Sequence, residues 1–362
     1  MRTMKVLVTG GAGFIGANLA IGLAADHPDW QVTALDNLQR RGSELNLPRL
    51  RAGGVRFVHG DVRASDDLLA VGPVDAVVEC SAEPSVLAGV DGSGLDRMVG
   101  TNLFGAYACL ELCRRHDAQL VFLSTSRVYP VDRLRALPLT ERRTRFELDD
   151  DKAVPGATGR GISEDLSLEG HRTLYGATKL AAELLIEEYV ATFGLRAVVN
   201  RCGVVAGPWQ MGKVDQGVVS YWMLAHMFRR PLTYIGFGGT GKQVRDLLHV
   251  DDLLGVIELQ LSDPGLWTGV VANVGGGPGC STSLLELTEL CAEITGNVVD
   301  VSAAPEDRPG DIPWYVTDCT RLNGLTPWRP SSTLRGILTD VHAWIRDNER
   351  QLGPALAIDG GR

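Results

Sequence analysis

Tyr175 and Lys179 lie four residues apart in the segment HRTLYGATKLAAE, residues 171–183, whose composition is typical of a helix. Side chains at this spacing share one face of a helix, one turn apart. A nearby cation favours the phenolate form of tyrosine and lowers its pKa, so the pair could transfer a proton. Tyrosine and lysine also meet at this spacing by chance in many helices, and the rest of the chain must decide between these interpretations.

A glycine-rich turn near the N-terminus gives the pair a context. Gly10, Gly13 and Gly16 follow a short apolar strand, residues 5–10, in the frame G-x-x-G-x-x-G, and a helical pattern begins at once. Such glycines allow a tight turn and a close approach of backbone to a pyrophosphate, which the N-terminus of the helix attracts. The pattern, in this strand–turn–helix setting, predicts a dinucleotide site.

A second strand, residues 30–36, ends in Asp36, 20 residues beyond Gly16. A carboxylate at that place can accept hydrogen bonds from both hydroxyls of an adenosine ribose and would repel a 2′-phosphate. We therefore expect NAD(H) rather than NADP(H). Arg40 and Arg41 follow closely and weaken that preference slightly.

The remaining pattern of the first half alternates strands and helices. Strand-like stretches at 55–62, 74–82 and 118–126 are separated by helical stretches near 64–70, 96–116 and 175–193. Alternation of this kind predicts an α/β fold with a doubly wound parallel sheet, in which ligands bind at the carboxyl ends of the strands.

Several polar residues fall at that edge of the predicted sheet. Asp61 could accept a hydrogen bond from the adenine amino group, although a turn-forming aspartate is an equal alternative. Asn102, inside a helix, could support either the helix or the cofactor. The expected cofactor contacts are Gly10, Gly13, Phe14, Ile15, Gly16, Asp36, Asn37, Asp61, Val62, Ser81, Asn102, Tyr175 and Lys179.

Thr125 ends the strand that precedes the helix of Tyr175 and Lys179. The three residues together could polarise a carbinol or carbonyl beside a nicotinamide. Tyr175 would be the general acid or base, Lys179 would lower the pKa of the phenol and hold a ribose hydroxyl, and Thr125 would hydrogen-bond the substrate oxygen. With a dinucleotide turn in the same chain, we favour this catalytic interpretation.

Together these segments resemble the extended short-chain dehydrogenase/reductase family of nucleotide-sugar enzymes. The resemblance covers nearly the whole chain and rests on VTGGAGFIG, LDNL, GDV, STSRVYP, YGATK, GKQVRDLLHVDD and RPGD. It implies a Rossmann domain, residues 1–201 plus 245–275, and a smaller, discontinuous nucleotide-sugar-binding domain, residues 202–244 plus 276–362. It also implies that NAD takes a hydride from a sugar carbon and returns it to the opposite face.

The resemblance further implies a set of substrate contacts. Arg245 and Arg308 match arginines that bind phosphate or ribose groups, although each could instead form a surface ion pair with Asp246 or Asp311. Glu83 falls near the substrate, where glutamine is common. With the candidates beside a predicted helix at 214–230, the expected substrate contacts are Glu83, Ser126, Arg127, Gln210, Asp215, Gln216, Arg245 and Arg308.

Departures from the family pattern limit the reactions that we expect the protein to catalyse. The 4,6-dehydratases carry Asp-Glu directly after the catalytic threonine, whereas Ser126 and Arg127 stand here, so the carboxylic acid for dehydration is missing. Glu79 replaces the usual histidine. Segments such as DNLQRRGSELNL and LTERRTRFEL are most similar to epimerases that invert C2 of a CDP-linked deoxysugar. A 4-epimerase, a 4,6-dehydratase, a net dehydrogenase and a non-catalytic NAD-binding scaffold are the alternatives.

The composition limits partners and location. The 362 residues carry a net charge of −9 with no long basic block, which argues against nucleic acid as a partner. The seven cysteines form no CxxC pair, so we expect free thiols in a reducing compartment and no metal site. We find no apolar run of transmembrane length and no signal peptide, so we expect no membrane partner and a cytoplasmic location.

Two further expectations concern assembly and the irregular part of the chain. The helix at 178–193 is apolar around more than one face, which predicts that a second helix packs on it across a dimer interface. The family resemblance implies a homodimer formed by this helix and the helix at 96–116. Residues 131–169 are charge-dense and rich in loop-forming residues, and we expect an irregular flap over the site, with a solvated insertion as the alternative.

Overall fold

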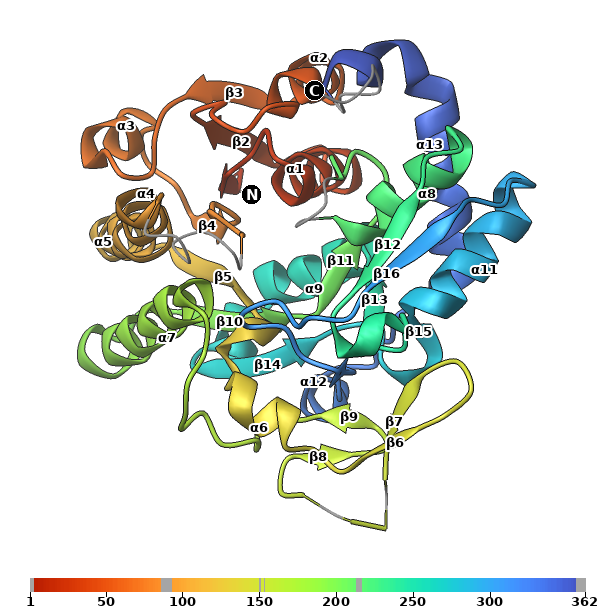
Figure 1. Ribbon diagram of the computed structural model, residues 1–362. Coiled ribbons are helices and arrows are strands. Elements are labelled where there is room, and N and C mark those ends of the chain that lie inside the picture. Colours follow the sequence, from red (N-terminus) through yellow and green to blue (C-terminus); the bar gives the residue numbers. More distant parts are fainter. Residues whose placement is uncertain (1–2, 86–92, 150, 153, 213–216, 356–362) are drawn as a thin grey trace. The chain divides into compact units, whose positions relative to one another are not determined.

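Residues 3–85, 93–149, 151–152, 154–212 and 217–355 are described in the computed structural model. The chain divides into two units, each discontinuous in sequence, and Figure 1 shows their elements. The first unit comprises Met1–Thr125, Leu174–Arg201 and Leu253–Ala272, and the second comprises Ser126–Thr173, Cys202–Asp252 and Asn273–Arg362.

A seven-stranded sheet with the order β14-β10-β5-β4-β1-β2-β3 forms the centre of the first unit. The pairs β1–β2, β2–β3, β1–β4 and β4–β5 are parallel. Strands of such a sheet are apolar on both faces because helices cover both; all seven residues of β5 are buried. The bounds are β1 (Lys5–Thr9), β2 (Gln31–Asp36), β3 (Arg56–His59), β4 (Ala76–Glu79), β5 (Gln119–Thr125), β10 (Ala197–Cys202) and β14 (Val270–Val274).

Helices lie on both sides of this sheet, α5 and α7 on one side and α1 and α9 on the other (Figure 1). Gly22 of α1 permits close packing with α9, because a Cβ there would lie 2.3 Å from Cδ2 of Leu254. The doubly wound parallel sheet expected from the sequence is confirmed. The helices are α1 (Phe14–Asp26), α2 (Leu47–Ala52), α3 (Ser65–Ala70), α4 (Leu95–Val99), α5 (Gly105–His116), α7 (Leu174–Phe193), α9 (Val250–Ser262) and α10 (Pro264–Trp267).

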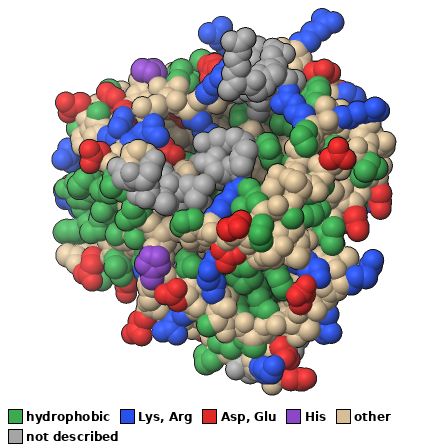
Figure 2. Space-filling model, in the orientation of Figure 1, with side chains coloured by type: hydrophobic (Ala, Val, Ile, Leu, Met, Phe, Trp, Pro, Cys, Tyr) green, Lys and Arg blue, Asp and Glu red, His purple; other side chains and the backbone are tan. Residues whose placement is uncertain are grey.

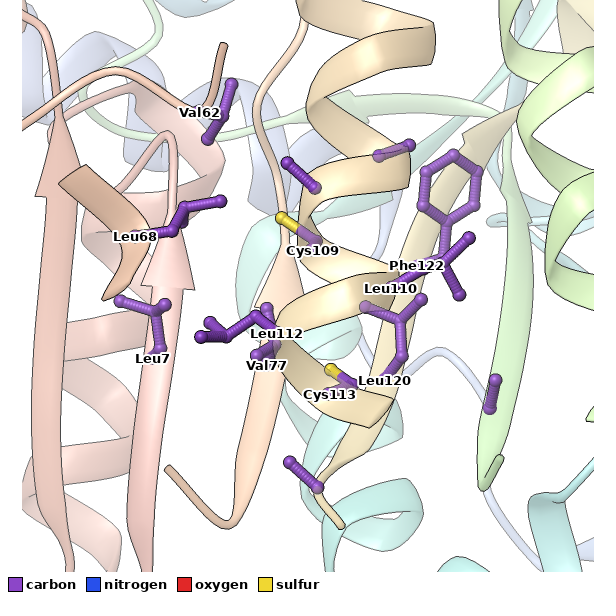
Figure 3. Close-up of a cluster of buried hydrophobic side chains, with 14 of the residues drawn as sticks. Leu7, Val62, Leu68, Val77, Cys109, Leu110, Leu112, Cys113, Leu120 and Phe122 are labelled. Carbon is purple, nitrogen blue, oxygen red and sulfur yellow. The ribbon is translucent and has the colours of Figure 1, made fainter. Parts of the chain in front are cut away.

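The hydrophobic core between the sheet and α5 explains why that helix packs as it does. Cys109, Leu112 and Cys113 recur at helical spacing and face the strands, where they meet side chains such as Val77 and Leu120 (Figure 3). All five are buried. Burial also raises the pKa of the Cys113 thiol well above its usual range, so this cysteine serves as an apolar packing residue in the neutral form.

The second unit contains a four-stranded sheet in which β13 pairs with β11, β15 and β17, together with three two-stranded sheets. Its strands are β6 (Leu139–Glu141), β7 (Phe146–Leu148), β8 (Ala157–Thr158), β9 (Gly161–Ile162), β11 (Val204–Ala206), β12 (Leu232–Ile235), β13 (Val244–His249), β15 (Ser281–Ser283), β16 (Val301–Ala304) and β17 (Trp314–Tyr315). Its helices are α6 (Val131–Arg135), α8 (Val218–Met227), α11 (Leu284–Thr295), α12 (Thr320–Leu325) and α13 (Leu334–Ala355).

Residues 131–169 are more regular than expected, although loops still connect their short elements, and their role as a flap stays a prediction. The segment contains α6 and two antiparallel hairpins, β6–β7 and β8–β9. One charge of the segment is used internally: Arg145 forms an ion pair of 2.5 Å with Glu286, the residue that also closes the capping box of α11 with Ser283. The segment therefore belongs to the packed structure of the second unit.

The two units also differ from the expected domain boundaries. Residues 126–173 fall in the second unit, as do residues 245–252, which we expected in the Rossmann domain. For residues 245–252 the reason is the pairing of β13. Among the described strands, β13 pairs with β11, β15 and β17 and with none of the seven-stranded sheet. In the part of the chain that the structure describes, no helix is long and apolar enough to cross a membrane.

Candidate active site

The glycine turn adopts the conformation that a pyrophosphate site requires. Gly10 has φ +60°, and a Cβ on Gly16 would lie 2.2 Å from the carbonyl oxygen of Gly10, so neither position accepts a larger residue without rearrangement. Gly13 is the N-cap of α1 and, as glycine, offers no side chain that could cap the first turn of the helix at Phe14 and Ile15. This first turn fits an anionic diphosphate group.

Asp36 lies at the carboxyl end of β2, beside this turn. Its carboxylate accepts hydrogen bonds from the backbone N–H of Ala12, at 3.1 Å, and of Leu38, at 2.7 Å. Burial raises the pKa of Asp36, while these N–H groups oppose the rise. Two carboxylate oxygens have about four lone-pair sites, so two vicinal ribose hydroxyls can still be accepted.

The neighbouring carboxylate, Asp61, is engaged by its own turn. It accepts hydrogen bonds from Arg63 Nε and from Asn37 Nδ2, both at 2.9 Å, and from the backbone N–H of Arg63. The Arg63 guanidinium holds the pKa of Asp61 well below its usual range. The turn-forming alternative is thus present, while adenine recognition by Asp61 stays a prediction. Val62, expected at the cofactor, packs in the hydrophobic core.

Asn102 supports the loop that follows β4 and carries the buried Ser81. Its Oδ1 accepts the backbone N–H of Glu83 at 2.8 Å, and its Nδ2 donates to Thr178 Oγ1 at 3.1 Å. Asn102 lies in a π-helical segment, Gly100–Phe104, between α4 and α5. Such segments are frequent at functional sites, and here the segment places the amide between the loop and α7.

The three expected catalytic residues all belong to the first unit. Thr125 is the last residue of β5 and is buried, Tyr175 lies half-buried in the first turn of α7, and Lys179 follows one turn later. The Lys179 side chain is only 2% exposed, and its Nζ lies 3.4 Å from Glu79 Oε2. The Phe122 ring faces the same ammonium at 4.1 Å. The lysine of the pair is therefore a buried cation between a carboxylate and an aromatic face.

A second buried charge network fixes α7 against the strands. Glu183, one turn after Lys179, forms an ion pair of 2.7 Å with Arg201 of β10 and accepts a hydrogen bond from the Ser124 hydroxyl. Because Ser124 immediately precedes Thr125, the network holds the end of β5 against the helix that carries Tyr175. This arrangement can fix the mutual positions of the catalytic threonine and tyrosine.

Two of the expected substrate contacts in the second unit, Arg245 and Arg127, already form hydrogen bonds within that unit. Arg245 forms an ion pair of 3.1 Å with Asp311 and donates to the Ile312 carbonyl, and burial lowers its pKa to about 10. Arg127 donates to the Gly310 carbonyl at 3.2 Å. Both arginines therefore meet the loop at 308–312, the segment that also contains Arg308.

Four further predicted contacts lie in different surroundings. Gln210 uses its amide to donate to the Val205 carbonyl at 2.8 Å, which gives it a structural task within the second unit. Glu83 forms an ion pair of 2.9 Å with Arg97. Asp215 and Gln216 lie outside the described residues.

Sequence reasoning missed several supporting residues. Asn46 donates to the Ala12 carbonyl at 2.8 Å and so supports the glycine turn from 34 residues away. The sequence around Glu183 and Arg201 did not indicate that they pair. Each was visible only as a charge, Glu183 within an apolar helix and Arg201 within a strand. Glu79 stood out only as a departure from the family pattern, without a partner.

Comparisons with known proteins agree with this geometry. The family model described as "NAD dependent epimerase/dehydratase family" matches residues 6–275. The chain is 29% identical over 352 residues to CDP-paratose 2-epimerase of Salmonella typhi, covering 94% of this chain and 99% of the relative. It is 30% identical to dTDP-glucose 4,6-dehydratase of Mycobacterium tuberculosis, covering 96% of this chain and 94% of the relative.

Among solved structures, the UDP-glucose 4-epimerase of Thermus thermophilus, in complex with NAD, has a TM-score of 0.74 and 27% identity, covering 95% of this chain and 99% of that structure. The family match spans well over half of the chain and includes the glycine turn, Asp36, Thr125 and the tyrosine–lysine pair. The chain therefore belongs to the NAD-dependent epimerase/dehydratase family of nucleotide-sugar enzymes.

Proposed function

We propose that the protein is an NAD-dependent nucleotide-sugar epimerase that oxidises one sugar carbinol transiently and reduces the resulting ketone on its opposite face. The observation that carries this proposal is the presence, in one folded unit, of Thr125, Tyr175 and Lys179 with an intact glycine turn and Asp36. A scaffold without catalysis would have no use for a buried lysine one turn after a half-buried tyrosine.

The side chains have separate tasks in this proposal. Bound NAD supplies the hydride acceptor and, after the ketone has turned over, the hydride donor. Tyr175 removes the hydroxyl proton in the first step and returns it in the last, and the Lys179 ammonium favours its phenolate form. Thr125 donates a hydrogen bond to the same substrate oxygen and keeps it oriented.

One observation argues against dehydration, and one similarity suggests C2 of a CDP-linked deoxysugar as the position inverted. Ser126 and Arg127 follow Thr125, so no carboxylic acid stands where dehydration needs one. CDP-paratose 2-epimerase is similar over nearly its full length. Inversion at C4 is the second candidate, which the similarity to a UDP-glucose 4-epimerase favours.

A panel of nucleotide sugars incubated in deuterated water tests this proposal, with the products read by NMR. We expect an epimer of a CDP-linked deoxysugar at C2 that carries no deuterium at the inverted carbon, because the hydride returns within one active site. Inversion at C4 would select the second candidate. A product that has lost water, or deuterium at the inverted carbon, would contradict hydride return.

Asp36→Ala should weaken NAD binding by about 10- to 100-fold, because hydrogen bonds to a charged acceptor contribute roughly 1.5–3 kcal/mol. Since burial raises the pKa of Asp36, wild-type affinity should also begin to fall at a higher pH, on acidification, than for an ordinary aspartate. Isothermal titration calorimetry measures both effects. Asp66→Ala, at an exposed aspartate in α3, is the control, and an unchanged affinity in Asp36→Ala would remove the ribose role.

For the substrate we propose that Arg245 and Arg308 bind the nucleotide diphosphate. Arg245 is already oriented by Asp311 and by backbone carbonyls, which reduces the entropy lost when its guanidinium meets a phosphate. Arg308 lies half-buried three residues before Asp311. Ser126 and Arg127 remain proposed contacts of the sugar, as does Glu83, although Arg97 now competes for its carboxylate.

We propose a homodimer formed through α5 and α7. Large apolar side chains exposed on or next to these helices include Phe104, Tyr107, Leu184 and Phe193, and Figure 2 shows hydrophobic side chains gathered at the side of the molecule where α5 and α7 lie. Such a surface needs a partner. A second copy would bury both helices in a four-helix contact. The cytoplasmic location expected from the free cysteines stays a prediction.

Leu184→Glu should convert the dimer into a monomer, because a charge at the centre of an apolar helix contact remains unpaired after burial. Sedimentation velocity of the two proteins at equal concentration checks this. Leu266→Glu, at a comparably exposed leucine of α10, should leave the mass of the complex unchanged. A wild-type protein that sediments as a monomer would refute the proposed contact.

A further inference from the structure

Lys179 and Glu79 form an ion pair that lies almost entirely out of contact with solvent. The two side chains are 2% and 1% exposed, and 3.4 Å separates Nζ from Oε2. Removing an ammonium from water costs several kcal/mol unless a counter-charge meets it. Glu79 is the carboxylate that meets Lys179 in the described part of the chain, from the end of β4.

The surroundings of the pair provide little else for either charge. Phe122 offers a ring face to the ammonium. Within the described residues, Glu79 Oε1 is buried without a hydrogen-bond partner. Cys109 is a further titratable group beside the pair, and burial raises its pKa well above the usual range, so it stays a neutral thiol.

The surroundings of the pair also affect the pKa of Glu79. Burial raises the pKa of Glu79, and the Lys179 ammonium and the Ser81 backbone N–H oppose that rise. Each charge of the pair therefore depends on the other. A neutral Glu79 would leave the ammonium without a counter-charge, and a neutral Lys179 would leave the carboxylate without one.

We propose that Glu79 is a positioning residue that acts through Lys179: its carboxylate keeps the buried ammonium charged and in the place from which it serves Tyr175 and the cofactor. This rests on the function proposed above. It assigns a task to the residue at which this chain departs from the histidine usual in its family.

The test reads the charge of Lys179 directly and needs no substrate. The chain has only five lysines, Lys5, Lys152, Lys179, Lys213 and Lys242, so ε-¹³C-lysine labelling gives few NMR signals. The signal that disappears in Lys179→Arg is that of Lys179. In Glu79→Gln we expect this signal to titrate at least about one pH unit lower than in the wild type, because a buried amine without a counter-ion loses its proton more easily.

Two further variants make the result specific. Glu79→Asp keeps the charge and should restore a wild-type-like titration, and Glu111→Gln, at a surface carboxylate of α5, should leave the signal unchanged. In steady-state assays, the high-pH limb of the kcat profile should move to lower pH in Glu79→Gln by about the same amount, with KM little changed. An unchanged Lys179 titration in Glu79→Gln would overturn the proposal.

A double variant keeps the proposal testable if Glu79→Gln does not fold. Glu79→Gln/Lys179→Met removes both charges and should fold where the single variant fails, because no unpaired buried charge remains. A double variant as unstable as the single one would overturn the counter-ion role. The NMR titration and the stability of the double variant do not involve turnover, so a failure of either leaves the epimerase proposal standing, and a failed epimerase assay leaves the titration result valid.

Discussion

Replacing Tyr175 by phenylalanine should lower kcat by about 10²- to 10⁴-fold, the usual contribution of a positioned general acid or base. The substitution removes one oxygen and keeps the ring, so α7 and the ion pairs of Lys179 and Glu183 should persist. NAD binding should therefore survive. Steady-state kinetics of epimerisation and calorimetric titration with NAD measure the two quantities on the same preparation.

The same helix offers a matched control. Tyr189 lies on α7 and donates its hydroxyl to Glu111 at 2.8 Å, and burial, together with this hydrogen bond, raises the pKa of Tyr189 to about 12. Tyr189→Phe should keep kcat near the wild-type value. Normal turnover in Tyr175→Phe, or an equal loss in both variants, would show that Tyr175 is not the proton-transfer group.

Arg201→Met should destabilise the protein by about 3–5 kcal/mol, because it leaves the Glu183 carboxylate buried without its counter-ion. The two side chains are 7% and 5% exposed, so water cannot replace the lost guanidinium. The midpoint of urea unfolding, followed by circular dichroism, measures the effect. Turnover at low temperature should fall as well, since Glu183 also holds Ser124 beside Thr125.

An exposed ion pair near the same strand provides the comparison. Arg196 and Asp117 lie 3.3 Å apart with side chains 41% and 99% exposed, and Arg196→Met should leave the urea midpoint nearly unchanged. Glu183→Leu/Arg201→Met, without either charge, should be more stable than Arg201→Met alone. A midpoint for Arg201→Met equal to that of Arg196→Met would mean that the buried pair contributes no stability.

The local signals in the sequence predicted the strands, the glycine turn and the helices of the first unit well. The apolar strands, the glycine turn, Asp36 and the helix that begins before Tyr175 are each specified by residues within about one turn or one strand of one another. Nearby residues also determine both ends of helix α11. Ser283 and Glu286 form the capping box at its start, and Gly296 ends it. Hydrophobic period and turn chemistry act over short distances, and a single sequence displays them.

The partners of buried charges were decided only by the tertiary structure. Glu79 and Lys179 are 100 residues apart in sequence, and Asn46 reaches the glycine turn across 34 residues. The placement of β13 in the second unit likewise depends on its pairing with β11, β15 and β17, which come from distant segments. A pair of residues far apart in sequence produces no periodic pattern. Several carboxylates in the chain could neutralise a buried lysine, so the sequence does not identify the partner. Only the tertiary fold brings this carboxylate, at the end of β4, within 3.4 Å of this ammonium on α7.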